Sequence, residues 1–457
     1  MRTKYGLRLF FCAFFLINSF SPFAGTLYAG SKRVVGYYPS WIRSVLPASK
    51  VQFSNLTHIN HAFAWPDSDG HIKKNSDLIY PALNRLVHEN NVKILVSFGG
   101  WGHAGGFSPV VSDSTKRSFF IGNLITFIKK YDYDGVDFDW EYPSSLSDRN
   151  NLTLLIKELR KRFDAENPDW LITFAVGTGN WTGQWFDYDQ LVKYVDWFNA
   201  MCYDYHGSWS AHSGHNAPLY QPPGDQCGAV DVGMNYLHNI RGIPKDQLTV
   251  GMPFYGREFN TSGLYNSFSG DVTEYLYSEI IKKIDQGWIY HWDNVAKVPY
   301  LTNSTNTKLI TYDDTLSIRL KCRWIKDNNY SGGMIWALGQ DFTDNSQPLM
   351  ETVGRELIQQ MFVQESPKVV REFTLRQNYP NPFNSGTVIS FNLRSGCYVR
   401  INVFNTMGEK IKTIAEGFFC SGNHAVNFNG SNLPSGIYYY ILENSGFRKI
   451  RSMVLVK

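Results

Sequence analysis

Residues 134–142 read DGVDFDWEY and place acidic side chains at alternate positions. In a β-strand, Asp137, Asp139 and Glu141 share one face and the large apolar residues between them share the other. Like charges at short range cannot all ionise, so a cluster of this kind favours a carboxyl group that stays protonated near neutral pH. A general acid requires such a group. The segment therefore predicts a strand that carries acid–base chemistry.

Two other interpretations of the acidic strand are weaker. Calcium-binding loops also space acids two residues apart, but they need a glycine turn and polar residues in between. Here the intervening residues include Phe138 and Trp140, which are large and apolar. A merely solvated strand face is the second alternative, and it fits poorly with an inner strand of a barrel.

Eight strand-like segments alternate with amphipathic helical segments along the first three quarters of the chain. This order predicts an α/β fold, a (β/α)8 TIM barrel, whose chemistry lies at the C-terminal ends of the strands. The strand-like segments are residues 34–39, 57–64, 92–100, 135–142, 170–177, 195–205, 248–256 and 332–339.

Two changes of pattern divide the rest of the chain. The long gap between the seventh and eighth strand-like segments predicts a small α+β insertion at about 258–312, on the rim of a barrel that spans 31–362. After a linker at 363–370, short alternating segments with turn signals predict a β-sandwich domain over 371–457.

The N-terminus is typical of a secretory signal peptide over residues 1–30, in which Arg2, Lys4 and Arg8 precede a short apolar run. A buried helix or a membrane anchor is the alternative, but the run is short for a membrane span, and no other stretch is long enough. We therefore expect an exported protein, secreted or held at the cell surface, with no stable membrane span.

Composition and charge exclude some classes of protein. Aromatic residues make up 16% and charged residues 18% of the 457-residue chain, which indicates packed domains rather than disorder. The formal net charge is +4, and without the signal segment it is +1, which argues against a nucleic-acid partner. Without Cys12 five cysteines remain, with no metal-ligand spacing and no disulfide framework, although Cys397 and Cys420 are a conceivable pair.

Five motifs in order resemble those of the family-18 glycoside hydrolases, the chitinase family. The resemblance covers about residues 32–355 and implies a barrel enzyme that needs no metal or cofactor and acts as a monomer on chitin or N-acetylglucosamine oligosaccharides. The motifs are DxxDxDxE (Asp134, Asp137, Asp139 and Glu141), SFGG at 97–100, MCYD at 201–204, GMPFYGR at 251–257 and GGMIWALGQD at 332–341.

The resemblance implies catalytic roles for four residues. An ordinary glycosidase flanks the scissile bond with two carboxylates, whereas Asp139 and Glu141 would approach a sugar from one side. The resemblance implies that the substrate's own N-acetyl oxygen is the nucleophile and that the reaction retains the anomeric configuration. Glu141 would protonate the glycosidic oxygen and then activate water. Asp139 would hold the acetamido N–H and share a proton with Asp137, which Ser97 supports, and Tyr203 would bind the acetamido carbonyl.

A second set of residues is implied to hold the sugars. Sugar rings pack their C–H faces on aromatic rings and need directed hydrogen bonds at their hydroxyl edges. Trp336 matches the floor of the subsite for the distorted sugar, whereas Trp41 is either a stacking platform or a core residue. The substrate-binding residues implied in this way are Tyr37, Trp41, Phe63, Ser97, Trp101, Met201, Asp204, Tyr255, Arg257 and Trp336.

Two alternatives to a chitinase remain open. An endo-β-N-acetylglucosaminidase acting on glycoprotein or cell-wall glycans would share the acid motif. A chitin-binding lectin is weaker, because binding-only members typically replace the acid and Glu141 is present. The sequence leaves endo and exo action open.

The last domain resembles the C-terminal sorting domains of the type IX secretion system. NYPNPFN at 378–384 and the terminal Lys457 are the specific features. The resemblance implies a type IX-like secretion machinery as partner and no catalytic role. A chitin-binding sandwich is the alternative, but the segment lacks an evident row of tryptophans.

Overall fold

The computed structural model describes residues 32–343, 345–359, 374–393, 397–419, 422–444 and 447–457. The expected signal segment, the linker at 363–370 and the side chains of Cys397 and Cys420 lie outside the described residues. Within the described part, no helix is long and apolar enough to cross a membrane.

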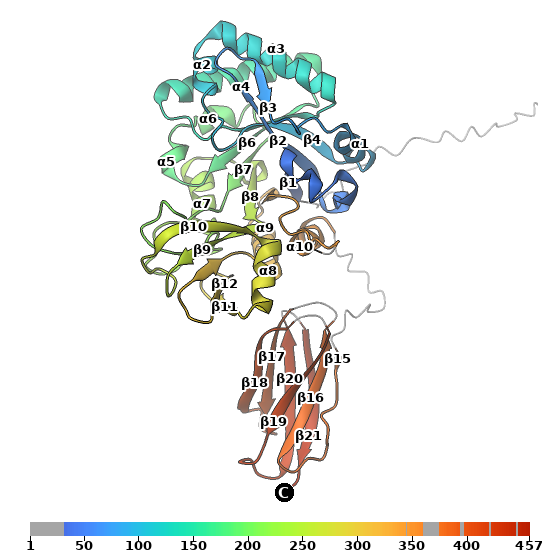
Figure 1. Cartoon of the computed structure of the whole chain (residues 1–457). Coiled ribbons are helices and arrows are strands. Elements are labelled where there is room, and N and C mark those ends of the chain that lie inside the picture. Colours follow the sequence, from blue (N-terminus) through green and yellow to red (C-terminus); the bar gives the residue numbers. More distant parts are fainter. Residues whose placement is uncertain (1–31, 344, 360–373, 394–396, 420–421, 445–446) are drawn as a thin grey trace, which may run out of the picture.

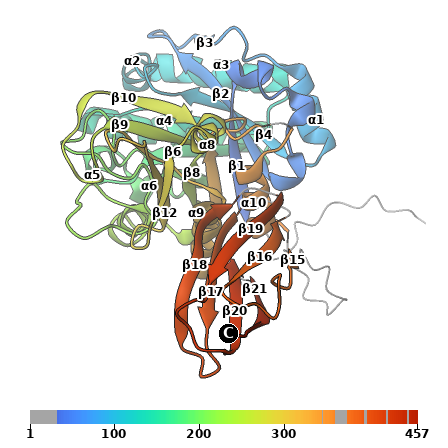
Figure 2. The ribbon, with the colours of Figure 1, turned by 60° about the horizontal axis from the view of Figure 1, so that its bottom comes forward.

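Eight parallel strands close into a barrel, as Figures 1 and 2 show. Each strand pairs in parallel with its neighbours, and the ring closes through the pairing of β1 with β2. This confirms the expected (β/α)8 fold. The barrel strands are β1 (Arg33–Pro39), β2 (His58–Pro66), β4 (Lys93–Gly99), β5 (Gly135–Asp139), β6 (Leu171–Gly177), β7 (Trp197–Met201), β8 (Leu248–Pro253) and β14 (Gly332–Trp336), and β3 (Ile72–Lys74) adds an antiparallel edge to β2.

Helices surround the barrel, and side-chain caps fix where several of them begin. Asp113 accepts hydrogen bonds from the backbone of Thr115 and Lys116 at the start of α3, and Asp314 caps α9 in the same way. The apolar residues between helices and strands form one large core. The helices are α1 (Pro81–Glu89), α2 (Phe107–Ser112), α3 (Ser114–Tyr131), α4 (Leu146–Glu166), α5 (Asn180–Gly183), α6 (Tyr188–Leu191), α7 (Val230–Asn235), α9 (Thr315–Asp327) and α10 (Pro348–Leu357).

The ends of the barrel segment meet in space. The backbone N–H of Lys32, just before β1, donates to the carbonyl of Leu357 at the end of α10 over 3.1 Å. Because β1 begins there, this junction lies at the N-terminal ends of the strands.

A five-stranded antiparallel sheet with one helix lies between β8 and β14 (Figure 1). The side chains of Ile280, Leu301 and Ile310 from this insertion are buried in the same core as the barrel, so the insertion is fixed to the barrel rather than tethered. Its elements are β9 (Tyr255–Asn260), β10 (Ser269–Leu276), α8 (Tyr277–Asp285), β11 (Ile289–Asp293), β12 (Val298–Thr302) and β13 (Leu309–Thr311).

The last domain is a β-sandwich with its own core. Its inward side chains, among them Ile389, Val399 and Tyr440, form a cluster separate from that of the barrel. One sheet has the order β15-β16-β19 and the other β18-β17-β20-β21. The strands are β15 (Thr374–Leu375), β16 (Gly386–Leu393), β17 (Cys397–Phe404), β18 (Lys410–Phe419), β19 (Gly422–Asn429), β20 (Gly436–Asn444) and β21 (Phe447–Leu455).

Candidate active site

The alternation expected for the acidic strand is present in β5. Val136, Phe138 and Trp140 are buried in the core between strands and helices, where Trp140 stacks on Phe107 of α2 at 5.1 Å between ring centroids. The opposite face of β5 points into the barrel and carries Asp137. The apolar face thus anchors the strand, and the acidic face is left for the barrel interior.

Asp137 is fully buried and accepts hydrogen bonds from four side chains. Ser97 and Thr173 lie level with it on the two neighbouring strands, so their hydroxyl groups reach it at 2.7 and 2.5 Å. The Tyr37 hydroxyl donates at 2.8 Å and the Asn199 amide at 3.2 Å. Burial raises the pKa of Asp137, and the four donors oppose this rise. The network holds the carboxyl group in one orientation.

Asp139 is the last residue of β5 and lies in a different environment. Its Oδ1 is buried and has no hydrogen-bond partner among the described residues. Burial, the neighbouring charge of Glu141 and then that of Asp137 raise its pKa well above the usual value. Asp139 is therefore the carboxyl group most suited to hold a proton at neutral pH. No hydrogen bond joins it to Asp137 among the described contacts, so the expected proton sharing stays a prediction.

Glu141 follows β5 by two residues and is partly exposed. Burial raises its pKa, and the charge of Asp204 adds to the rise. A carboxyl group with a raised pKa, reachable from solvent, can donate a proton and take it back. Non-proline cis peptide bonds lie at Glu141–Tyr142 just after β5, at Ala62–Phe63 within β2 and at Trp336–Ala337 where β14 ends.

Met201 ends β7, and Tyr203 follows it. The Tyr203 hydroxyl lies 3.9 Å from the sulfur of Met334, and its ring meets the Tyr255 ring edge-on at 6.1 Å. Its pKa is raised well above the usual value by burial and then by Asp139. Tyr203 therefore remains a neutral hydroxyl group that can donate a hydrogen bond.

Asp204 links the end of β7 to the insertion. Its Oδ1 accepts a hydrogen bond from the Tyr255 hydroxyl at 2.6 Å and from the Arg257 guanidinium at 3.0 and 2.6 Å. All three residues were predicted to contact substrate, and the structure brings them together. The carboxylate places two donor-bearing side chains at the rim of the barrel.

Aromatic rings lie at the end of β14 and within β2. Trp336 stacks on Phe63 with 5.8 Å between centroids and meets Tyr37 edge-on at 5.5 Å. Trp41 is 53% exposed and Trp101 77% exposed. Because half of the Trp41 side chain is open to solvent, the alternative that it is a core residue does not hold.

The sequence reasoning missed four residues of this region. Thr173 and Asn199 bind Asp137, and the alternation within their strands was the signal for both. Trp181 is 76% exposed and meets Tyr142 edge-on at 5.7 Å. Trp209 is 60% exposed and lies under the Arg257 guanidinium, 5.0 Å from the ring centroid. Trp181 lies in the short helix α5 and Trp209 in a loop, and no periodicity in the sequence marks either.

The first aspartate of the motif has a separate role. Asp134 precedes β5 at the opposite end from Glu141, where it accepts hydrogen bonds from His88 at 2.9 Å, from Lys93 at 2.9 Å and from the backbone N–H of Ile94 at 2.8 Å. It joins β5 to α1 and β4 and lies away from the acid cluster.

The fold and the site together define a (β/α)8 barrel protein with a carboxylate cluster at the C-terminal ends of its strands. The chain belongs to the glycosyl hydrolases family 18, whose model matches residues 33–341. A second model, that of the secretion system C-terminal sorting domain, matches residues 377–457.

Known proteins resemble the barrel region. The chain is 30% identical to Chitinase A1 of Niallia circulans, over 68% of this chain and 57% of that protein. The Group IV chitinase of Ostrinia furnacalis, solved in complex with allosamidin, gives a TM-score of 0.66 at 27% identity, over 71% of this chain and 98% of that one. A family 18 N-acetylglucosaminidase from Paenibacillus barengoltzii gives 0.65 at 30% identity, over 71% and 100%. The chain spans a little over half the length of the first curated relatives that it matches.

Proposed function

We propose that this protein is a chitinase that hydrolyses β-1,4 linkages between N-acetylglucosamine units. The observation that carries the proposal is the pair of carboxyl groups with raised pKa, Asp139 and Glu141, on one side of the site and beside the neutral hydroxyl of Tyr203. The names of the relatives agree with this substrate class. The family, in turn, is what makes a glycoside the expected substrate.

In the first step, Glu141 donates its proton to the glycosidic oxygen. The acetamido oxygen of the substrate attacks the anomeric carbon, and the bond to the leaving sugar breaks. Asp139 accepts a hydrogen bond from the acetamido N–H and, once it has passed its proton towards Asp137, stabilises the positive charge of the oxazolinium-like intermediate. Tyr203 donates to the acetamido oxygen and orients it for attack.

In the second step, the ionised Glu141 takes a proton from water. The water oxygen attacks the anomeric carbon from the side that the leaving sugar vacated, and the ring of the intermediate opens. Two inversions at one carbon leave the β-configuration unchanged. The same carboxyl group thus acts first as acid and then as base.

The aromatic rings supply the grip on the substrate. We expect Trp336, which stacks on Phe63, to lie under the sugar at the cleavage point, and the exposed rings of Trp41 and Trp101 to stack further sugars. Asp204, Tyr255 and Arg257 offer hydrogen bonds to hydroxyl groups. We expect a chain of several sugars rather than a single one to be bound.

A second candidate is an N-acetylglucosaminidase acting on other glycans. The Paenibacillus barengoltzii neighbour carries that name, so this fold is found under both activity names. A lectin is a weaker candidate, because the acid Glu141 is present together with Asp139 and Tyr203.

The test is the anomeric form of the product released from a chitin oligosaccharide, followed by NMR from the first minutes of reaction. We expect fresh β-anomer, because the substrate's own amide is the nucleophile. Glu141→Gln should keep oligosaccharide binding nearly unchanged and lower turnover by a factor of about 10² to 10⁴ or more, since it removes the proton and preserves the shape.

Glu166→Gln, which changes an exposed glutamate ion-paired with Lys129 on the barrel surface, is the matched control and should retain full turnover. Fresh α-anomer would exclude participation of the N-acetyl group. Near-normal turnover of Glu141→Gln would overturn the acid assignment. A folded native protein that cleaves only glycoprotein glycans would select the second candidate.

A further inference from the structure

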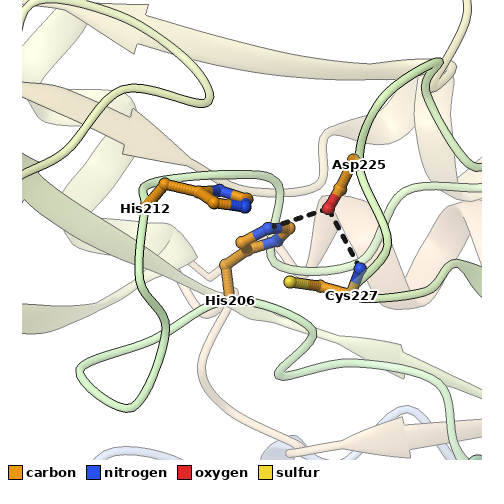
Figure 3. A group of neighbouring side chains, drawn as sticks. All are labelled: His206, His212, Asp225 and Cys227. Atoms are coloured by element: carbon orange, nitrogen blue, oxygen red, sulfur yellow. Dashed lines mark hydrogen bonds and ion pairs between the residues drawn. The ribbon is translucent and has the colours of Figure 1, made fainter.

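Four potential metal ligands gather in the connection between β7 and α7, as Figure 3 shows. The ligand atoms of His206, His212, Asp225 and Cys227 all lie within 4.8 Å of one another. The two histidines come from the first part of the connection, and Asp225 and Cys227 come from its second part. No local spacing in the sequence marks such a site.

His206 is fully buried, and its hydrogen bonding fixes which nitrogen is free. Nδ1 lies 3.0 Å from the carbonyl oxygen of His215, so Nδ1 carries a proton and donates it there. In a neutral imidazole, the lone pair is then on Nε2. Nε2 points to Asp225 (Figure 3), 3.3 Å from Oδ1, and has no hydrogen-bond partner within the described residues.

Asp225 is 4% exposed and also lacks a full set of donors. Its Oδ1 accepts the backbone N–H of Cys227 at 3.0 Å, while its buried Oδ2 has no partner in the part of the chain that the structure describes. A carboxylate and an imidazole lone pair that face each other repel unless a proton or a cation lies between them.

The other two side chains complete the set. Nδ1 of His212 lies 3.0 Å from the carbonyl oxygen of Ser213, which again leaves Nε2 free to bind. Cys227 is not in a disulfide, so its sulfur can act as a ligand, and it is exposed, so a metal ion can reach the cluster from solvent on this side. In both histidines a backbone carbonyl orients the ring, as is usual for metal ligands.

We infer that His206, His212, Asp225 and Cys227 form a structural zinc site. Two imidazoles, a carboxylate and a thiolate suit Zn²⁺ in tetrahedral geometry, and four protein ligands leave no position open for substrate. Ligand atoms about 2.0 to 2.3 Å from a zinc ion lie roughly 3.3 to 3.8 Å from one another. The four ligand atoms here lie within 4.8 Å of one another, so the widest pair has to approach by about 1 Å when the ion binds. Binding releases the thiol proton of Cys227 and forms the zinc–thiolate bond.

The ion would clamp a loop that borders the candidate active site. His206 lies two residues after Asp204, whose backbone N–H donates to Asn216 at 3.1 Å within the same loop. Trp209, which lies under the Arg257 guanidinium, falls between the two histidine ligands. Zinc would therefore tie the first part of the loop to residues 225–227 and hold the rim of the site in place.

The test is a titration of the full-length, untagged, metal-free protein with Co²⁺, followed by displacement with Zn²⁺. One equivalent of Co²⁺ should give the visible bands of a tetrahedral ion and a thiolate-to-cobalt band in the near ultraviolet, and Zn²⁺ should remove both. Cys227→Ser should lose the thiolate band. His212→Asn should weaken binding at least about tenfold. Cys227 is exposed, His212 is half-buried, and neither belongs to a helix or strand, so the variants should fold.

Cys322→Ala is the matched control, because Cys322 is a free cysteine on the buried face of α9, far along the chain from the cluster, and the variant should keep the thiolate band. Glu141→Gln should bind the metal as the native protein does, which separates this inference from the proposed activity. The inference would be overturned if the native protein bound no Co²⁺, or if Cys227→Ser and His212→Asn both bound Co²⁺ as the native protein does. His206 and Asp225 would then form an ion pair without a metal.

Discussion

At the residue scale, Asp137 and Asp139 show how position alone separates two identical side chains. They lie two residues apart on β5, yet Asp137 receives four hydrogen bonds while Oδ1 of Asp139 receives none among the described contacts. Donors favour the charged form of a carboxyl group and burial without donors favours the neutral form. Burial raises the pKa of both, but the four donors oppose the rise at Asp137, so Asp139 is the better suited of the two to hold a proton.

This difference predicts how Asp139 affects stability. Its pKa in the folded state is raised above the unfolded value of about 3.9. The folded protein thus retains a proton that the unfolded chain has already lost, so the stability that this proton confers is present at low pH and decreases as the pH rises. Asp139→Asn cannot ionise, and it should melt about 2 °C or more above the native protein at pH 8, with a gap that closes towards pH 4.

The measurement is thermal unfolding of both proteins across that pH range, with turnover measured in parallel. Asp271→Asn, at an exposed position of β10, should leave the melting temperature unchanged at every pH. Turnover of Asp139→Asn should fall steeply even as stability rises. A variant that is less stable than the native protein at pH 8 would mean that Asp139 is charged and stabilising there.

The face of each acid could be predicted from the sequence, because alternation along a strand decides it. Alternation also places Thr173 and Asn199 on the inward face of β6 and β7, but that they meet Asp137 could not be predicted, because it depends on the closure and register of the barrel. The exposure of Trp181 in the short helix α5 and of Trp209 in a loop is likewise set by packing that no periodicity in the sequence predicts.

At the element scale, the end of β4 is shaped by two glycines. Gly99 has φ of +123°, and a Cβ atom there would lie 2.1 Å from the carbonyl oxygen of Asp139. The N–H of Gly100 donates to the same oxygen at 2.8 Å. This close approach of two backbones fixes where Asp139 stands, so the SFGG motif positions the acid rather than contacting substrate through its glycines.

Gly99→Ala should therefore lower both stability and turnover. Both the left-handed backbone and the missing space oppose the methyl group, and we expect a loss of about 2 kcal/mol or more in the free energy of unfolding. Denaturant unfolding measures the loss. Gly105→Ala, where a Cβ would meet nothing within 4 Å, is the control and should behave as the native protein. Equal stability of the two variants would argue against the contact.

Strand order was predictable, and strand ends were less so. The acidic segment was expected to run as a strand over 135–142, but β5 ends at Asp139, and the segment at 195–205 gives only Trp197–Met201. Apolar and aromatic residues continue in the sequence beyond the last residues of β5 and β7, in segments that border the site. The alternating pattern is therefore longer than the strands, and it does not show where the hydrogen-bonded ladder stops.

At the scale of the whole molecule, the barrel and the sandwich have separate cores, and each matches its own family. The shift in composition that predicted two domains reflects these two cores. The linker expected at 363–370 stays a prediction, because it falls outside the described residues. We propose that the sandwich serves export by a type IX-like machinery and that the protein is secreted or held at the cell surface.

Deletion of residues 371–457 should separate export from catalysis. The purified barrel should hydrolyse chitin oligosaccharides within about twofold of the full chain, since its core needs no residue of the sandwich. In the native host the truncated protein should remain inside the cell, which fractionation followed by immunoblotting would show. Normal export together with loss of binding to insoluble chitin would instead identify the sandwich as a carbohydrate-binding domain.

The hydrogen bond between Lys32 and Leu357 brings the start and the end of the barrel segment of the chain together, at the opposite end of the barrel from the acids. A partner domain joined on either side of the barrel thus begins far from the catalytic end. The barrel is in this sense interchangeable: it can be circularly permuted, or moved between chains with different appended domains, without rerouting the backbone across the site.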